Sequence, residues 1–158
     1  MSQKEDNKSA GPAIRNKKAF FNFEIVEKVE AGMSLLGTEV KSLRNKQCDM
    51  DASYARIEGN QCWLIGCKIA PYEKAAGANH EPLRKRKLLL HKAQIKKLKT
   101  KLDQRGFTLV PLGVYFNQRG IAKIELGLAT GKRQYDKRKK IQEKDQKRQM
   151  GRDMKKYG

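Results

Sequence analysis

Two pairs of alternating segments, each joined by a short polar turn, constrain the fold of this chain most strongly. The pairs are residues 53–58 with 62–69 and residues 107–116 with 121–129. Gly59-Asn60-Gln61 and residues 117–120 supply the polar turns. Alternation of apolar and polar side chains is typical of half-buried strands, so the sequence predicts two β-hairpins.

The alternation also predicts which side chains of the hairpins face inward. In each hairpin the second strand carries four apolar residues at every other position, namely Trp63, Ile65, Cys67 and Ile69 in one and Ala122, Ile124, Leu126 and Leu128 in the other. Pro111 interrupts the strand over 107–116 and indicates an edge or a bulge, because proline cannot donate a ladder hydrogen bond.

A further strand and a short helix are predicted before the first hairpin. Phe21, Phe23 and Ile25 alternate with polar residues, which predicts a strand continuing toward residue 29. The segment Glu30-Ala31-Gly32 is expected to end that strand, with Gly32 free to adopt a positive φ.

Thr38 is then predicted to cap a helix that begins at Glu39. Helical spacing puts three apolar side chains of this region on one buried stripe, namely Leu36, Val40 and Leu43. Lys41 and Arg44 lie off the stripe and are expected to face solvent or a ligand.

A second helix is predicted from Lys92 to Arg105, with Ile95, Leu98 and Leu102 on one face and Gly106 as its stop. Two hairpins, an extra strand and about two to three helices fit a mainly β fold with some α, a small β-barrel of the OB-like class. Spacing alone leaves an SH3-like barrel open. The barrel is predicted over residues 16–131, after a flexible N-terminus at residues 1–15.

Charge indicates the class of partner. The 158 residues include 36 Lys or Arg and 17 Asp or Glu, a formal net charge of +19 that favours a polyanion. Nucleic acid is therefore the expected partner. No apolar run approaches the roughly 20 residues that span a bilayer, and the N-terminus lacks a secretory signal. A cytoplasmic protein without a membrane partner is expected.

Catalytic, metal-binding and cofactor sites are not expected from this sequence. Cys48, Cys62 and Cys67 lack metal-ligand spacing, and His80 and His91 are the two histidines. Cys62 and Cys67 are expected to be small core side chains. The sequence contains no recognisable nucleophile–base arrangement and no phosphate-binding loop.

Residues 83–90 join four consecutive cations to three leucines, which cannot all be buried or all exposed. A surface edge that contacts phosphates and turns into core is favoured over a solvated face or a localisation signal. Glu30 adds a carboxylate beside the cationic helix around Lys41. A carboxylate can accept hydrogen bonds from nucleobase amino groups, which lysine and arginine cannot do. An ordinary amphipathic helix with solvated lysines is the alternative.

Residues 132–158 form a basic tail, with twelve Lys or Arg and four Asp or Glu in 27 positions. Its few apolar residues cannot offset the entropy of ordering it, so disorder in the free protein is expected. Tyr135 lies inside a cationic run, where a base can stack on its ring.

Several runs together resemble the small protein B (SmpB) family. They are Asn16-Lys17-Lys18-Ala19, Glu30-Ala31-Gly32, Gly37 to Arg44, Arg86 to Leu90, Gly131-Lys132 and Asp136-Lys137-Arg138. The resemblance implies an adaptor that binds the tRNA-like domain of transfer-messenger RNA and enters ribosomes stalled on a message lacking a stop codon. There the tail would become helical in the decoding centre and message channel, and the nascent peptide would be tagged. The resemblance thus implies RNA and not DNA as the partner, with the chain acting as a monomer.

The resemblance also implies site residues. By motif, Asn16, Glu30 and Leu90 resemble the family's RNA-contacting positions, and charge and position add Lys17, Lys41, Arg44, Arg84 and Lys87. The decoding-centre segment is implied to comprise Gly131, Lys132, Tyr135, Asp136, Lys137 and Arg138. Some relatives carry histidine at position 135, so a role that needs imidazolium is not expected of this tyrosine.

Two other readings account for part of the sequence. A ribosomal protein or general RNA chaperone also explains the charge and the tail. A small RNA-processing nuclease would need a convergent partner for Glu30, Asp136 or His91, and the sequence offers no such pattern.

Overall fold

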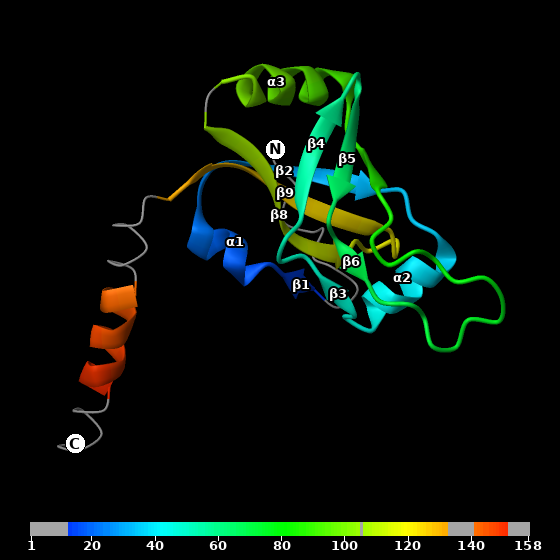
Figure 1. Ribbon diagram of the computed structural model, residues 1–158, viewed down its shortest axis with the longest axis horizontal. Helices are drawn as coiled ribbons and strands as arrows, with labels where there is room; N and C mark the ends of the chain where they lie inside the picture. The colour runs from blue at the N-terminus through cyan, green and yellow to red at the C-terminus, as the bar shows by residue number, and fades with distance from the viewer. Residues whose placement is uncertain (1–12, 105, 133–140, 152–158) are drawn as a thin grey trace.

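The centre of the molecule is a closed ring of six antiparallel strands (Figure 1). The computed structural model describes residues 13–104, 106–132 and 141–151. In spatial order the strands are β8 (Phe107–Phe116), β4 (Tyr54–Glu58), β5 (Gln61–Ile65), β7 (Arg86–Leu89), β2 (Phe23–Met33) and β9 (Ala122–Gly131), and β9 pairs back onto β8. The short β1 (Ile14–Arg15) also pairs with β8. This arrangement confirms the OB-like barrel.

Helices and a small ribbon surround the ring. The helices are α1 (Lys17–Asn22), α2 (Gly37–Arg44), α3 (Lys92–Leu102) and a helix over 141–151. A separate ribbon pairs β3 (Cys48–Asp49) with β6 (Lys68–Ile69). Figure 1 shows α3 at one end of the barrel and α1 and α2 toward the other. Within the described residues, no helix is long and apolar enough to cross a membrane.

Both predicted hairpins are present. The β4–β5 turn is Gly59-Asn60, with Glu58 opposite Gln61 and Gly59 at φ +61°, a conformation that glycine adopts without strain. In β9 the predicted inward residues Ala122, Ile124, Leu126 and Leu128 are all buried. The register of β8 against β9 shifts between Pro111 and Gly113, which confirms a bulge at the proline.

The inward face predicted for the first hairpin is wrong for two of its four residues, Trp63 and Ile65. Cys62 and Leu64 are the buried residues of β5, whereas Trp63 and Ile65 are only half-buried. Gly66 then takes φ +79°, where an added Cβ would lie 2.8 Å from the carbonyl oxygen of Ala52. This turn reverses the alternation, so Cys67 and Ile69 are buried as predicted.

The strand predicted from Phe21 begins later, at Phe23. Phe21 belongs to α1, a helix that the alternation concealed. Asn16 begins α1 because its side-chain oxygen accepts a hydrogen bond from the backbone N–H of Ala19. Residue 23 is also where β2 starts to pair with the end of β9, so tertiary pairing sets the boundary.

The expected break at Glu30-Ala31-Gly32 is also wrong. β2 runs through all three residues to Met33, paired with β9 on one side and β7 on the other. Gly32 stays outside the left-handed region. A Cβ at this position would lie 3.3 Å from Cβ of Leu89, so the glycine permits close approach of the β7 side chain.

α2 begins two residues before the predicted start, at Gly37. Thr38 does not cap it, because the N-cap residue is Leu36, whose backbone N–H donates to the Glu39 carboxylate at 2.8 Å. Leu43 is fully buried and Val40 packs against the core, but Leu36 is 50% exposed. The predicted buried stripe is therefore correct for Val40 and Leu43 and wrong for Leu36.

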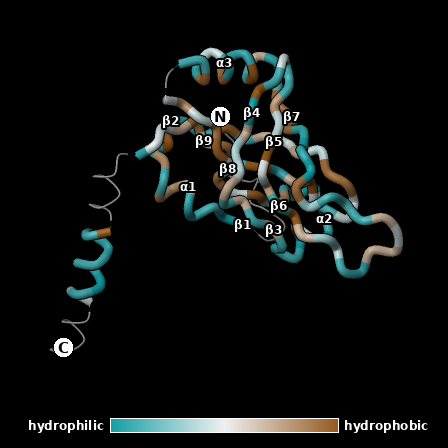
Figure 2. Tube along the Cα trace, viewed as in Figure 1, coloured by the Kyte–Doolittle hydropathy of each residue, from teal (hydrophilic) through white to brown (hydrophobic). Residues whose placement is uncertain are grey.

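α3 follows its prediction closely. It starts at Lys92 and ends at Leu102, with Ile95 and Leu98 buried and Gly106 beyond it at φ +89°. Figure 2 shows hydrophobic colour concentrated on the barrel strands and hydrophilic colour on α3 and on the helix over 141–151. That the tail is disordered when free, and the division at residues 15 and 131, stay predictions.

Candidate nucleic-acid interface

The largest described groove lies where β2, β7 and β9 meet the start of α3. It has a volume of about 750 Å³, and its outer lining includes Lys87, Leu89, Lys92, Ile121 and Lys123. Leu89 and Ile121 are 53% and 48% exposed, so both offer apolar surface to a ligand at this groove. Lysines around an apolar floor can contact phosphates while the floor meets sugars and base faces.

Strand register places Glu30 beside this groove. Gly32 lies opposite Leu89 on one side and Lys123 on the other, and Glu30 precedes Gly32 by two residues on β2. The side chain of Glu30 is exposed, and across the described part of the chain it forms no hydrogen bond or ion pair. Its carboxylate is therefore free to accept hydrogen bonds from a ligand.

Lys87 and Leu90 belong to the same surface. Both line the groove and both are half-buried, with Leu90 also packed against the core. The structure therefore brings together three of the predicted RNA-contacting residues, Glu30, Lys87 and Leu90.

α2 carries two exposed cations, of which Arg44 lies next to the groove. The guanidinium of Arg44 lies 4.4 Å from the ring centre of Phe116 and donates to the carbonyl oxygen of Gly120 at 3.3 Å. Gly120 directly precedes Ile121, which lines the groove. Lys41 lies 5.3 Å from the ring centre of Tyr72. Both cations are held by aromatic rings and stay accessible to an anion.

Arg84 has a different environment. It donates to Oε1 of Glu39 at 2.6 Å, while Arg86 donates to the other carboxylate oxygen. Glu39 and Arg86 are fully buried, and Arg86 also donates to the carbonyl oxygens of Cys67 and Pro82. We call Glu39, Arg84 and Arg86 the Glu39 cluster. Burial would raise the pKa of Glu39, but hydrogen bonds from Arg84, the Leu36 N–H and Arg86 hold that pKa below its ordinary value.

The Glu39 cluster corrects the phosphate-contacting edge predicted within residues 83–90 at Arg86, whereas Lys87 of the same run lines the groove. β7 is paired on both sides, with β5 and β2, and is not an edge strand. Arg86 is buried inside the fold, and Arg84 is engaged by Glu39 and by the carbonyl oxygen of Ser34. Contact between Arg84 and RNA stays a prediction, but the described role of Arg84 is to join β7 to α2.

Asn16 and Lys17 lie on α1, apart from the groove. Asn16 is 5% exposed, and its amide donates to the carbonyl oxygen of Pro111 at 2.8 Å, so its described role is structural. Lys17 is exposed. Lys132 lies nearby, because its backbone N–H donates to the carbonyl oxygen of Asn22 and its ammonium to that of Phe20. Gly131, the last residue of β9, is therefore held beside α1.

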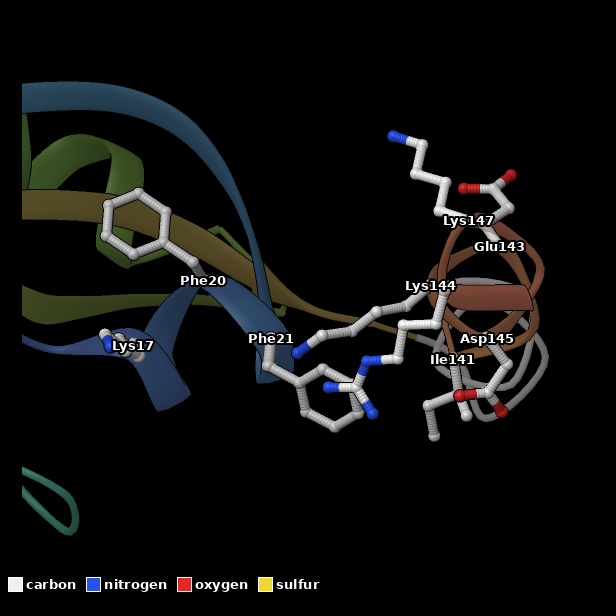
Figure 3. Close-up of a pocket in the computed structure, with 9 residues that line it drawn as sticks. Lys17, Phe20, Phe21, Ile141, Glu143, Lys144, Asp145 and Lys147 are labelled. Atoms are coloured by element: carbon white, nitrogen blue, oxygen red, sulfur yellow. The ribbon is translucent and has the colours of Figure 1, made fainter. Parts of the chain in front are cut away.

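An open cleft separates α1 from the helix over 141–151. Its volume is about 560 Å³ and its lining includes Lys17, Phe21, Ile141 and Arg148. Figure 3 shows Phe21 projecting from α1 toward the helix while Phe20 points the other way. The tail residues Tyr135, Asp136, Lys137 and Arg138 lie outside the described residues.

The sequence did not point to most of the groove residues, among them Leu89, Lys92, Ile121 and Lys123. Leu89 lies in a run of three leucines, which gives no alternation to read. Because successive side chains of a strand point to opposite faces, Leu89 faces away from the side on which Leu88 is buried. The three others come from separate elements, so a single sequence carries no signal that they converge.

Comparisons with known proteins identify relatives of this chain. A family profile described as SmpB protein matches residues 13–156. A relative from Chlorobaculum tepidum, named SsrA-binding protein, is 48% identical over 157 residues, covering 99% of this chain and 100% of the relative. A Sulfurihydrogenibium relative with the same name is 53% identical over 135 residues, covering 85% of this chain and 88% of its own.

A solved structure is also similar. Described as "tmRNA-SmpB: a journey to the center of the bacterial ribosome", it matches with a TM-score of 0.68 and 49% identity, covering 83% of this chain and 95% of its own. The profile match and the relatives both extend over most of the sequence. This chain belongs to the SmpB family.

Proposed function

We propose that this chain is a noncatalytic adaptor that binds the tRNA-like domain of transfer-messenger RNA and delivers it to stalled ribosomes for trans-translation. The observation that carries the proposal is the groove between β2, β7 and β9, with its lysines, its apolar floor and the unpaired Glu30 carboxylate beside it. Relatives named SsrA-binding protein and a neighbour described as tmRNA-SmpB in the ribosome support the identity of the RNA.

The groove residues have complementary roles in this proposal. Lys87, Lys92 and Lys123 contact phosphates, which provide affinity without reading sequence. Leu89 and Ile121 offer exposed apolar surface to sugars and unstacked bases. Glu30 accepts hydrogen bonds from base amino or imino groups and supplies the discrimination that lysines cannot.

The α1 region orients the tail. Lys132 is fixed to α1 by two hydrogen bonds to backbone carbonyls, so the tail leaves the barrel at a defined point next to Lys17. From there Tyr135 to Arg138 enter the decoding centre and the residues beyond follow the empty message channel as a helix.

Competition binding tests the barrel's part in this function. Full-length protein is bound to the isolated tRNA-like domain near physiological salt and challenged with excess ordinary tRNA. Persistent binding is expected, and complete displacement would mean generic polycation behaviour. Glu30→Ala is expected to weaken this binding much more than binding to bulk RNA. Glu24→Ala, at an exposed position on the same strand, is the matched control.

Truncation before Lys132 tests the tail's part. The truncated chain is expected to keep most of its affinity for the tRNA-like domain, because the groove is intact, and to lose peptide tagging in a translation assay on a message without a stop codon. Normal tagging by the truncated chain would refute the proposed role of the tail.

A further inference from the structure

Two cysteine thiols meet at the ribbon beside α2. Sγ of Cys48, in β3, lies 3.5 Å from Sγ of Cys67, which directly precedes β6. Cys48 is half-buried and Cys67 is 1% exposed. A disulfide bond has a length of about 2.05 Å, so bonding requires the sulfurs to approach by about 1.5 Å.

The backbone holds both cysteines where they are. The N–H of Ala70 donates to the carbonyl oxygen of Gln47 at 3.0 Å, next to Cys48 in the sequence. The carbonyl oxygen of Cys67 accepts from Nη1 of the buried Arg86 at 2.7 Å. Both sides of the pair are therefore anchored by hydrogen bonds, and the short S···S separation follows from the fold and not from a mobile loop.

The surroundings divide the roles of the two thiols. The hydrogen bond from the Cys48 thiol lowers the pKa of Cys67, burial opposes that shift, and the nearby Arg86 guanidinium acts in the same direction as the hydrogen bond. The same contact, together with burial, raises the pKa of Cys48. Cys67 is thus the thiol that more readily becomes a nucleophilic thiolate, and Cys48 is the one that solvent reaches.

We propose that Cys48 and Cys67 form an oxidation site, a preorganised dithiol that hydrogen peroxide converts into an intramolecular disulfide. Peroxide first transfers one oxygen to one of the two sulfurs, giving a sulfenic acid and one water. The other sulfur then attacks the sulfur of the sulfenic acid, the S–O bond breaks, and the departing hydroxide takes up the proton of the attacking thiol as a second water. The two sulfurs lose two electrons and the peroxide gains them.

The new bond would cross-link the β3–β6 ribbon, which lies beside the helix that carries the α2 cations. Cys48 lies four residues after Arg44, and Arg86, which contacts the Cys67 carbonyl, is also paired with Glu39 of α2. A bond closing residues 48–67 restricts the unfolded chain, so a stabilising effect is expected. Cys62 is an internal control, because it is fully buried in β5 and the described contacts give its sulfur no thiol neighbour.

Oxidation of the full-length reduced protein tests the proposal. After brief exposure to hydrogen peroxide, thiols are titrated in denaturant, the intact mass is measured without reductant, and a peptide map locates any cross-link. The expected result is a fall from three free thiols to one, a loss of two hydrogens, a Cys48–Cys67 peptide, and reversal by dithiothreitol. The melting temperature is expected to rise by about 5 °C.

Variants identify the pair and define failure. Cys62→Ala is expected to retain the mass loss, whereas Cys48→Ser and Cys67→Ser are expected to lose it. Oxygen addition without hydrogen loss, a disulfide-linked dimer, or a cross-link to Cys62 would overturn the proposal. A bond that forms but lowers the melting temperature would overturn the claim that the ribbon is preorganised for it.

Discussion

Two cationic segments that look alike in the sequence are used differently in the structure. Residues 84–87, at the start of β7, are Arg-Lys-Arg-Lys, and α3 carries five lysines in eleven residues. In the first segment Arg84 and Arg86 are bound by Glu39, and Lys85 pairs with Glu58. In α3 the described contacts give only Lys101 an acidic partner, Glu27.

The difference lies in distant carboxylates. Glu39 and Glu58 are 45 and 27 residues away from the cations they bind, so composition near β7 says nothing about them. The exposed lysines of α3 instead repel one another, as at Lys92 and Lys96, which are four residues apart on the helix. Paired cations build the fold, and unpaired cations remain for an anionic partner. Four changes, in descending order of their expected effect on folding, test this difference between paired and unpaired cations.

Glu39→Gln is expected to have the largest effect. It leaves the fully buried Arg86 guanidinium without a countercharge, which costs about 3–5 kcal/mol in comparable buried pairs. Urea unfolding at pH 7 measures the loss. Glu58→Gln, at a solvent-exposed pair, is the matched control and should leave the urea midpoint nearly unchanged. Equal midpoints for the two variants would remove the distinction between a buried and a solvent-exposed ion pair.

Acidification should reduce the same stabilisation in the unaltered protein. Because the pKa of Glu39 is lower in the folded state than its ordinary value of 4.5, its contribution is complete above that value and is lost as pH falls through the folded pKa. The melting temperatures of the wild-type protein and Glu39→Gln should therefore converge as pH falls below 4.5. A constant gap would mean that the carboxylate is not the stabilising group.

Lys85→Gln should have a small effect on folding. Its ammonium contacts Glu58 and lies 4.7 Å from the ring centre of Trp63, but the pair is exposed to solvent and salt. A urea midpoint close to that of the wild-type protein is expected. A loss comparable to that of Glu39→Gln would place this pair in the structural group.

Replacing Lys92, Lys96, Lys97 and Lys99 together by glutamine should affect folding least. It removes like-charge repulsion from α3, so the melting temperature should hold or rise slightly. RNA affinity should become less dependent on salt, by roughly 0.7–0.9 log units per log salt for each phosphate that the helix no longer neutralises. An unchanged salt slope would show that α3 does not contact phosphates.

Local patterns predicted those parts of the fold that depend on neighbours in sequence. The turn at Gly59-Asn60, the inward face of β9 and the bulge at Pro111 all follow from spacing or backbone chemistry. α1 was missed because Phe21 and Phe23 mimic a strand period. The prediction for the inward face of β5 was wrong because Gly66 adopts a left-handed conformation, which reverses the alternation of buried and exposed residues. A side chain at this position would also lie too close to the carbonyl oxygen of Ala52.

The candidate site was predictable only where a motif supplied it. Lys87 and Leu90 were named from the sequence and line one groove, and Glu30 lies on β2 two residues before the groove residue Gly32. Arg84 and Asn16 were named by charge or motif, yet their described partners are Glu39 and the carbonyl of Pro111. Whether a cation faces a ligand or a buried carboxylate is decided by pairings between strands and helices that are distant in sequence.

The most direct test is to map which surface touches the RNA. A photoreactive residue is placed at Ile121, in the groove, and separately at Tyr54, an exposed position at the far end of β4 from the turn that borders the groove. Each protein is bound to the tRNA-like domain and irradiated. Cross-linking from position 121 and little from position 54 is expected. Strong cross-linking from position 54 with none from 121 would contradict the assignment of the groove as the RNA-binding surface.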